Sequence, residues 1–377
     1  MSDNHLHIVA FDVPFPPNYG GVIDVFYKIK ELHKRGIKLH LHVIEYPGRE
    51  RAPELDVYCE SVNYYPRLTG IKSAFSFVPY IVKSRRSPQM VQNLLKDNYP
   101  ILFEGLHSCY YLDDSRLKNR LLIYRESNIE HHYYYNLFKA EHHWGKKAYF
   151  LVESLKLRLF QQKLKHATIM LVVSKGDRDY LQKIFPDKEI HYLPSFHANT
   201  EVKSALGKGN YFLYHGNIEV PENEAAASFL IRKVFQGTLH KLIIAGMNPP
   251  KTIQQLAVLN NNVEVISNPD EKLMFKLIRE AQANILVTFQ ASGLKLKLLN
   301  TLYNGRFCIV NSTMLNGTDL DTLCIIGDKP SSLRDIVFNI ADEEFTSDII
   351  AERETVLQKN FSNAVNADRV INIIFNR

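Results

Sequence analysis

Cysteine is scarce in this sequence. The 377 residues contain only Cys59, Cys109, Cys308 and Cys324, and no two of these form a CxxC pair. Such scattered cysteines give little support to a zinc site or a disulfide framework. We therefore expect reduced thiols and a cytoplasmic protein.

Long apolar runs are also lacking. No run of 18 or more apolar residues occurs, and residues 1–7 are polar and lead directly into a strand-like segment. This pattern predicts neither a signal peptide nor a membrane-spanning helix. Any contact with a membrane is expected to be peripheral, on the inner membrane surface.

Charge of one sign does not dominate. Forty-six lysines and arginines face 40 aspartates and glutamates, which gives a net charge of +6. A mild and diffuse excess suits an anionic ligand or an anionic membrane surface, and it does not indicate nucleic-acid binding. At this length the chain is expected to form two domains or one large one.

The standard phosphate-binding motifs are missing. Gly20 and Gly21 fall between a predicted strand and a predicted helix, where glycine lets the backbone approach an anion at the helix start. They do not form GxGxxG, and the Walker lysine is absent, which disfavours a dinucleotide dehydrogenase or a P-loop enzyme. A tight turn without a ligand is the alternative reading of these glycines.

What the chain does contain is an alternation of strand and helix patterns. In the first half, strands are predicted at residues 6–11, 38–44, 101–103, 121–124 and 168–173, and apolar residues between 22 and 32 recur at helical spacing. Ser174 and Asp177 predict the start of a further helix. Residues 193–210 lack periodicity and read as a linker. A second series of strands follows at residues 211–214, 242–245, 263–266, 285–289 and 307–310.

This pattern predicts an α/β protein with two Rossmann-like domains that face each other across a cleft. The predicted domains span residues 1–195 and 196–360, and a C-terminal helix at residues 361–377 is expected to cross back to the first domain. Ligands of open parallel sheets bind at the carboxyl ends of the strands, so the cleft is the expected site.

The segment from residue 292 to 311, SGLKLKLLNTLYNGRFCIVN, is the most informative. If Lys295 lies in the loop before a helix that carries Lys297, both cations reach one anion above the strand ends. Fixed cations stabilise the charge that grows on a diphosphate leaving group, and they do so without a metal. Two solvated surface lysines are the alternative.

Four segments together resemble a glycosyltransferase of the GT-B type, in the large retaining family 4. They are PFPPNYGG at residues 14–21, RESNIEHHYYYNL at 125–137, YHGNIEVPENEAAASFL at 214–230, and the lysine segment above. The resemblance covers most of the chain and implies a transfer from a nucleotide-diphosphate-sugar substrate, without a cofactor or metal, to a glycan or lipid-linked acceptor. It places the acceptor in the first domain and the donor in the second.

The resemblance also implies roles for single residues. His107, Lys295 and Lys297 would be catalytic, with His107 near the transferring sugar and the lysines at the diphosphate. The other positions that it marks are donor-binding Gly20, Gly21, Asn217, Gly293 and Asn300, and acceptor-side Asn128 and Glu130. Without the resemblance, His107 reads equally as a loop residue.

The sequence departs from the family at one pair of positions. Members usually carry two glutamates, and here Ser292 and Asn300 occupy those places. Asparagine can still hydrogen-bond to ribose hydroxyls, but it carries no charge. A non-catalytic GT-B-like subunit that binds a partner or a glycan in a polysaccharide assembly complex therefore stays open, as does a sugar-nucleotide epimerase.

Other clusters admit simpler readings. Four histidines at residues 131, 132, 142 and 143 lack the spacing of a metal site. Asp113 and Asp114 fit a loop or a helix cap better than a metal-binding pair. Residues 67–90 mix basic and aromatic side chains, which fits an amphipathic lid that touches anionic lipid or the acceptor. A core helix with snorkelling lysines fits them equally well.

Overall fold

The computed structural model describes residues 4–70, 76–141, 143–289 and 296–376. They form two compact units. The first contains the described residues up to Ala198 and from Asn360 onward, and the second contains those from Asn199 to Lys359.

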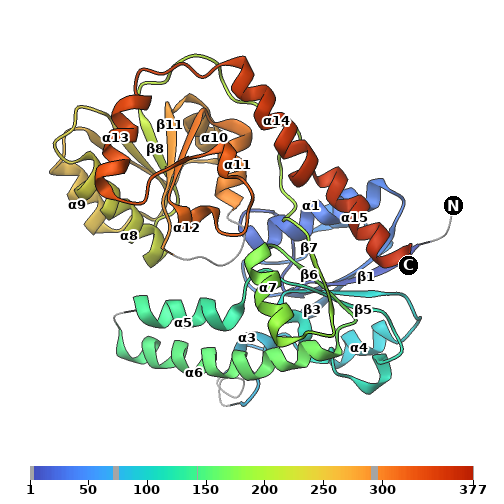
Figure 1. Ribbon diagram of the computed structural model, residues 1–377. Coiled ribbons are helices and arrows are strands. Elements are labelled where there is room, and N and C mark those ends of the chain that lie inside the picture. Colours follow the sequence, from blue (N-terminus) through green and yellow to red (C-terminus); the bar gives the residue numbers. More distant parts are fainter. Residues whose placement is uncertain (1–3, 71–75, 142, 290–295, 377) are drawn as a thin grey trace. The chain divides into compact units, whose positions relative to one another are not determined.

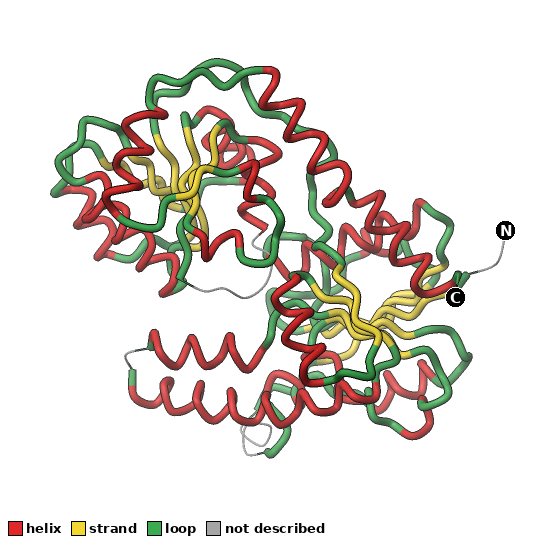
Figure 2. The backbone as a smooth tube through the Cα atoms, in the orientation of Figure 1, coloured by secondary structure: helices red, strands yellow, loops and turns green. Residues whose placement is uncertain are grey.

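The first unit is built on a parallel seven-stranded sheet in the order β3-β2-β1-β4-β5-β6-β7 (Figures 1 and 2). Its strands are β1 (His5–Val9), β2 (Lys38–Glu45), β3 (Ser61–Pro66), β4 (Ile101–Glu104), β5 (Leu122–Arg125), β6 (Ile169–Val172) and β7 (Glu189–Tyr192). Central strands such as β4 and β6 are short and buried throughout, as expected where helices cover both faces of a sheet.

Helices cover both faces of this sheet. On one face α1 (Gly20–Lys34) and α15 (Asn363–Phe375) bury Ile29, Leu32 and Val370. The helices assigned to the opposite side are α3 (Tyr80–Lys83), α4 (Pro88–Leu94), α6 (Trp144–Phe160) and α7 (Lys175–Ile184), which join a second core cluster. The C-terminal helix thus packs against α1, as the sequence predicts, and Arg35 donates a hydrogen bond to the Ala364 carbonyl at 2.8 Å.

The second unit repeats the plan with a six-stranded parallel sheet in the order β10-β9-β8-β11-β12-β13. The strands are β8 (Phe212–Asn217), β9 (Leu242–Met247), β10 (Val263–Ser267), β11 (Ala283–Leu286), β12 (Phe307–Val310) and β13 (Ile325–Ile326). The helices are α8 (Pro221–Phe229), α9 (Lys251–Val258), α10 (Glu271–Glu280), α11 (Leu296–Asn304), α12 (Ser312–Leu315), α13 (Pro330–Ile340) and α14 (Ser347–Phe361). Both units are therefore Rossmann-like, as predicted.

Residues 130–166 contain no proline and only one glycine, yet they do not form one continuous helix. They form two helices, α5 (Glu130–Ala140) and α6, which pack against each other as a hairpin. Glu141 adopts an extended conformation after α5, and the His143 ring accepts a hydrogen bond from the Lys146 amide at the start of α6.

The segment predicted as a lid or a core helix contains two short helices, α3 and α4, and its described residues include both buried and exposed side chains. Ile81, Val82 and Met90 are buried in the first unit, and the Arg85 side chain is buried as well. Residues 71–75 lie outside the described ranges. Within those ranges, no helix combines the length and apolar character needed to cross a bilayer.

Candidate functional site

The loop after β1 brings a glycine against an aromatic ring. Gly20 and Gly21 open α1, as the sequence predicts, and Tyr19 precedes the helix as its N-cap. A Cβ atom on Gly21 would lie 2.6 Å from Cζ of Phe11, so any larger residue would displace that ring. Gly21 therefore lets the first turn of α1 approach the carboxyl end of β1 closely.

His107 lies beyond the end of β4, next to the same ring. Its centroid is 5.2 Å from that of Phe11, and its Nδ1 atom is 3.8 Å from Oε1 of Glu130. That distance is too long for a hydrogen bond, and Nδ1 is buried without a hydrogen-bond partner in the described part of the chain. Burial holds the pKa of His107 well below its ordinary value, and the charges of Arg85 and Arg67 lower it further.

Glu130 begins α5 at the carboxyl end of β5, and its side chain is buried. Burial raises the pKa of Glu130 to about 8, although Arg85 and a hydrogen bond to Ser127 oppose the shift. At neutral pH the acid therefore holds its proton beside a neutral imidazole. Asn128 is half-buried in the same turn between β5 and α5.

A basic and aromatic cluster lies under the carboxyl ends of β1 and β4, and no motif in the sequence indicates its contacts. Arg85 donates to Oδ1 of Asp12 at 3.2 Å and to the Phe11 carbonyl at 2.7 Å. Tyr46 donates to the same aspartate at 3.0 Å, and the Arg67 guanidinium lies 5.0 Å from the Tyr46 ring. Arg85 thus fixes the carboxyl end of β1 from inside the protein.

Arg125, the first residue of the RESNIE motif, lies in a buried charge network. It donates to both carboxylate oxygens of Asp24 at 3.2 Å and to the Leu193 carbonyl at 2.6 Å. Lys28 lies between Asp24, at 3.0 Å, and Glu104, at 2.7 Å. These ion pairs join α1, β4 and β5 directly below the edge that carries His107 and Glu130.

The second unit places Lys297 near the carboxyl end of β8. Lys297 is the second residue of α11, and its Nζ atom donates to Oδ1 of Asn223 at 3.1 Å. The same ammonium lies 5.2 Å from the Tyr214 ring. A cation near a helix N-terminus favours an anion at this place, because the free N–H groups of the first turn add to its field.

Asn217 ends β8 and shapes the turn that follows. Its side-chain oxygen accepts from the Glu219 amide at 3.2 Å, and its carbonyl accepts from the Asn223 side chain at 2.8 Å. Through Asn223, Asn217 is linked to Lys297. In the first turn of α8, Glu222 accepts a hydrogen bond from Thr288, which follows β11.

Asn300 belongs to an amide network. Its Oδ1 atom accepts from Asn199 at 2.9 Å, and its carbonyl accepts from Asn304 at 2.9 Å. Asn304 in turn donates to Asn199 at 2.9 Å. The side chain at the place of the family's second glutamate is thus joined to the start of the second unit. Lys295 and Gly293, and Ser292 with them, lie outside the described ranges.

The remaining polar clusters have contacts of their own. Asp114 caps a short 3₁₀ turn by accepting from the Arg116 amide at 3.0 Å, as the cap reading predicts. The Nε2 atom of His131 lies 3.1 Å from the Tyr180 hydroxyl. Over residues 4–70, 76–141, 143–289 and 296–376, no group of three or more His, Cys, Asp or Glu has a metal-binding arrangement.

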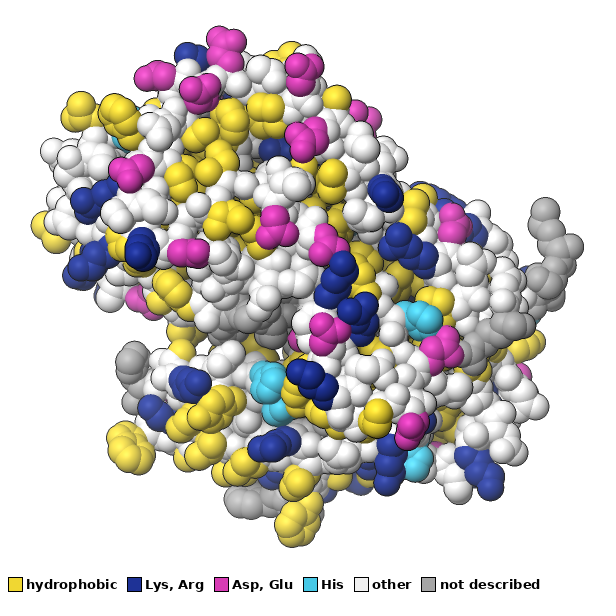
Figure 3. Space-filling view, viewed as in Figure 1, with side chains coloured by type: hydrophobic (Ala, Val, Ile, Leu, Met, Phe, Trp, Pro, Cys, Tyr) yellow, Lys and Arg dark blue, Asp and Glu magenta, His cyan; other side chains and the backbone are white. Residues whose placement is uncertain are grey.

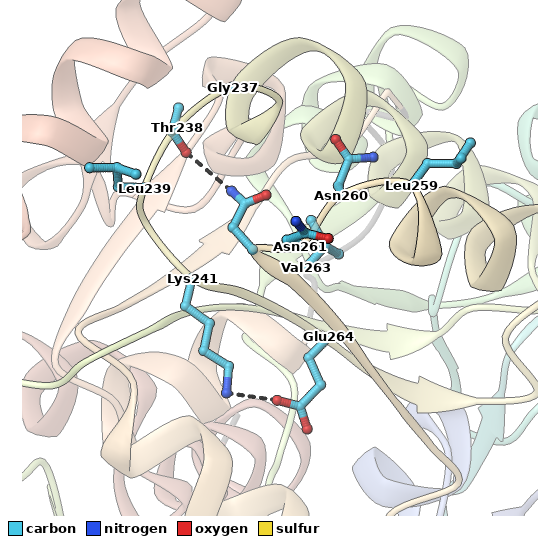
Figure 4. Close-up of a pocket in the computed structure, with 10 residues that line it drawn as sticks. Gly237, Thr238, Leu239, Lys241, Leu259, Asn260, Asn261, Val263 and Glu264 are labelled. Carbon is cyan, nitrogen blue, oxygen red and sulfur yellow. Dashed lines mark hydrogen bonds and ion pairs between the residues drawn. The ribbon is translucent and has the colours of Figure 1, made fainter.

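A surface hollow of about 670 Å³ lies at the opposite edge of the second sheet (Figure 4). It is lined by residues that precede β9 and β10, among them Asn260, Asn261 and the ion pair of Lys241 with Glu264 at 2.7 Å. Ligands of parallel sheets bind at the carboxyl ends of the strands, so this hollow is a poor candidate for the functional site.

One known protein is related to the chain in sequence, and solved structures share its fold. No family model matches the chain. A Klebsiella pneumoniae protein described as "Uncharacterized 44.6 kDa protein in cps region" is 28% identical over 333 residues, which cover 82% of this chain and 84% of that protein.

Solved structures match over nearly the whole length. An S. aureus TarM mutant crystallised with UDP has a TM-score of 0.67 at 9% identity, with 99% of this chain and 100% of that chain covered. Anabaena HepE in complex with UDP and glucose has a TM-score of 0.63 at 10% identity, with 98% of each chain covered. A UDP-forming trehalose-phosphate synthase from Burkholderia xenovorans has a TM-score of 0.60 at 9% identity, with 98% of this chain and 99% of that chain covered. The chain therefore has the two-sheet GT-B fold that these structures share.

Proposed function

We propose that this protein is a glycosyltransferase that moves a sugar from a nucleotide-diphosphate-sugar to a glycan or lipid-linked acceptor in polysaccharide synthesis. The observation that carries the proposal is the position of Lys297. Its ammonium is held by Asn223 and the Tyr214 ring, at the first turn of α11 near the carboxyl end of β8. The Asn223 amide and the face of the Tyr214 ring orient this cation.

In this mechanism Lys297 stabilises the diphosphate as the sugar leaves. Negative charge grows on the leaving group in the transition state, so a fixed cation lowers the barrier more than it strengthens ground-state binding. Lys295 is proposed as a second cation, and Asn217, Gly293 and Asn300 as further donor contacts. No metal is needed for this charge balance, and the proposed transfer retains the anomeric configuration.

The first unit is proposed to bind the acceptor. His107 and Glu130 are both neutral at neutral pH, because burial depresses the pKa of the histidine and raises that of the acid. Neutral groups can hydrogen-bond to sugar hydroxyls without repelling a nearby anion. Asn128, in the same turn as Glu130, is a further acceptor-side candidate. Gly20 and Gly21 are proposed to face the donor phosphates.

Two comparisons support this assignment. TarM and HepE share the fold and were crystallised with UDP, which favours a uridine nucleotide as the first donor to try. The Klebsiella relative lies in a cps region, which favours polysaccharide synthesis.

The test is a donor assay on Lys297→Ala, with Lys297→Arg and Lys272→Ala as controls. Lys272 is an exposed lysine in the first turn of α10, and it belongs to none of the segments that carry the proposed site. Loss of a charge-stabilising group typically lowers kcat by about 10²–10³-fold. We expect that loss in Lys297→Ala, partial activity in Lys297→Arg, and wild-type turnover in Lys272→Ala. Near wild-type turnover by Lys297→Ala would refute the role of this lysine.

A second candidate is a non-catalytic GT-B-like subunit. Its motivation is the amide network in which Asn199 hydrogen-bonds Asn300, at the place where a typical member has an acid for the ribose. Calorimetry with a panel of nucleoside diphosphates separates the two functions. Binding of at least one nucleotide, weakened in Lys297→Ala, is expected of the enzyme. Absence of binding by the whole panel would favour the non-catalytic subunit.

A further inference from the structure

The α5–α6 hairpin carries an exposed apolar stripe on its second helix. Trp144, Val152, Leu155 and Leu159 recur at helical spacing, so they lie on one face of α6. Trp144 is 87% exposed and Leu159 75% exposed. Single exposed leucines are common on protein surfaces, whereas a contiguous exposed apolar patch indicates a binding surface.

The opposite face of α6 is occupied by the protein. Leu157 and Phe160 are buried in the first unit's core. Ser154 donates to the His131 carbonyl at 2.8 Å, and the Phe150 ring meets the Tyr134 ring edge to face at 6.0 Å. The stripe is therefore not needed to fold the hairpin, and α6 presents it to the surroundings as a rigid ridge.

Cations flank the stripe. Residues 130–160, which form the hairpin, contain five lysines and arginines and three glutamates. Two of the glutamates, Glu130 and Glu153, are buried, so the surface of the hairpin is strongly cationic. On a helical wheel Lys156 and Arg158 fall on either side of the stripe. Figure 3 shows hydrophobic side chains and dark blue lysines and arginines interspersed over this part of the molecule.

A second exposed aromatic residue belongs to the same neighbourhood. The amide of Tyr80 donates to Oε2 of Glu153 on α6 at 2.6 Å, which ties the start of α3 to this helix. Phe77 precedes Tyr80 by three residues and is fully exposed.

We propose that this face of α6 binds the surface of an anionic lipid bilayer. The apolar stripe enters the boundary between headgroups and acyl chains, and the flanking lysines and arginines contact the anionic headgroups. Tryptophan suits that boundary, because its ring is apolar and its N–H is polar. A second copy of the chain fits less well, since two cationic hairpins repel each other. The inference does not depend on catalysis, and it would place the first unit beside a lipid-linked acceptor.

The sequence supplies the probe, because Trp144 is the single tryptophan of the chain. Its emission is recorded as vesicles are added, either of phosphatidylcholine alone or with about 30% phosphatidylglycerol. We expect a blue shift with the anionic vesicles, little or none with the neutral ones, and reversal by salt. Sedimentation with the same vesicles measures the partition coefficient.

Two pairs of variants separate the contributions of the stripe and the charges. Leu155→Ser with Leu159→Ser should weaken partition more than tenfold, because both leucines lose their apolar contact with lipid. Lys147→Gln with Arg158→Gln, two cations on one side of the stripe, should weaken it about fivefold per charge. The controls are Leu239→Ser with Val258→Ser, which lie in the second unit and are more exposed than the two stripe leucines, and Lys272→Gln with Lys276→Gln on α10. Circular dichroism confirms that each variant is folded.

Four outcomes would overturn the proposal. One is unchanged Trp144 emission on anionic vesicles, and another is an equal shift on neutral vesicles. The third is a blue shift that grows with protein concentration in the absence of lipid, which would assign the stripe to self-association. Equal losses of binding in the stripe variants and their controls would likewise exclude this face.

Discussion

The clearest stability prediction concerns Glu130, a buried acid at the candidate site. Replacement by glutamine keeps the size and shape of the side chain and removes the carboxyl that ionises. The pKa of Glu130 is raised from 4.5 to about 8 by burial. The wild-type protein should therefore lose stability as the pH rises from 4.5 to 8, and the Glu130→Gln variant should not.

The sign and magnitude follow from proton linkage. Between pH 4.5 and 8 the folded state holds a proton that the unfolded chain has released. The free energy of unfolding consequently falls by about 1.4 kcal/mol for each pH unit of increase. At neutral pH the accumulated loss is about 3 kcal/mol, and it levels off once the folded acid has ionised. Glu130→Gln should be more stable than wild type by about that amount, with no gain near the unfolded pKa.

The assay is urea unfolding over a series of pH values, followed by hydrogen exchange at the amides of β5 so that the first unit is observed separately. The control is Glu60→Gln, the same change at an exposed side chain, which should alter stability by less than about 0.5 kcal/mol. A variant less stable than wild type in mild alkali, or a difference independent of pH, would refute the reasoning. A gain in stability with a loss of transfer activity is the result expected of a functional acid.

Two further predictions concern the first unit. His7 and His42 lie 2.9 Å apart and are buried, which lowers the pKa of His7 to about 4 and that of His42 well below its ordinary value. As the pH drops, these histidines are protonated in the unfolded chain before they are protonated in the folded protein. The free energy of unfolding should therefore fall between pH 6.5 and 4, by about 3 kcal/mol for His7 alone. Denaturant midpoints measured across that pH range test this. Lys28→Met should cost about 3–5 kcal/mol, because it leaves Glu104 buried without its cation. Thermal unfolding should show a smaller loss for Lys28→Met combined with Glu104→Gln, and equal losses would contradict the ion pair.

The sequence predicts the central strands better than the edges of the sheets. Buried strands such as β4 and β6 appear as short apolar runs, and the Ser174 cap of α7 is visible from its spacing to Asp177. The edge strands β3 and β7 were missed, because their side chains are mostly half-buried and polar. A strand with one neighbour needs no continuous apolar run, so its pattern resembles a loop.

The candidate site is less accessible to sequence reasoning than the fold, because hydrogen-bond partners depend on tertiary packing. The RESNIE pattern does not distinguish Arg125, which holds α1 in place through Asp24, from Glu130, which has no lysine or arginine as a direct partner among the described residues. The pattern around Lys297 likewise gives no sign that Asn223 and Tyr214 orient its ammonium. Arg85 lies in a segment with an amphipathic pattern, and only the fold places it against Asp12.

The candidate site residues differ in whether their polar side-chain atoms have hydrogen-bond partners. Arg125 makes two bonds to Asp24 and a further one to the Leu193 carbonyl, so its position is explained by the stability of the fold alone. His107 is different, because its Nδ1 atom is buried and lacks a hydrogen-bond partner within the described residues. A buried nitrogen without a partner destabilises a protein by about 1–3 kcal/mol, and Glu130 nearby adds the cost of a raised pKa. Two adjacent groups that both reduce stability are better explained by a ligand than by folding, and we therefore propose His107 and Glu130, rather than Arg125, as the acceptor-side groups.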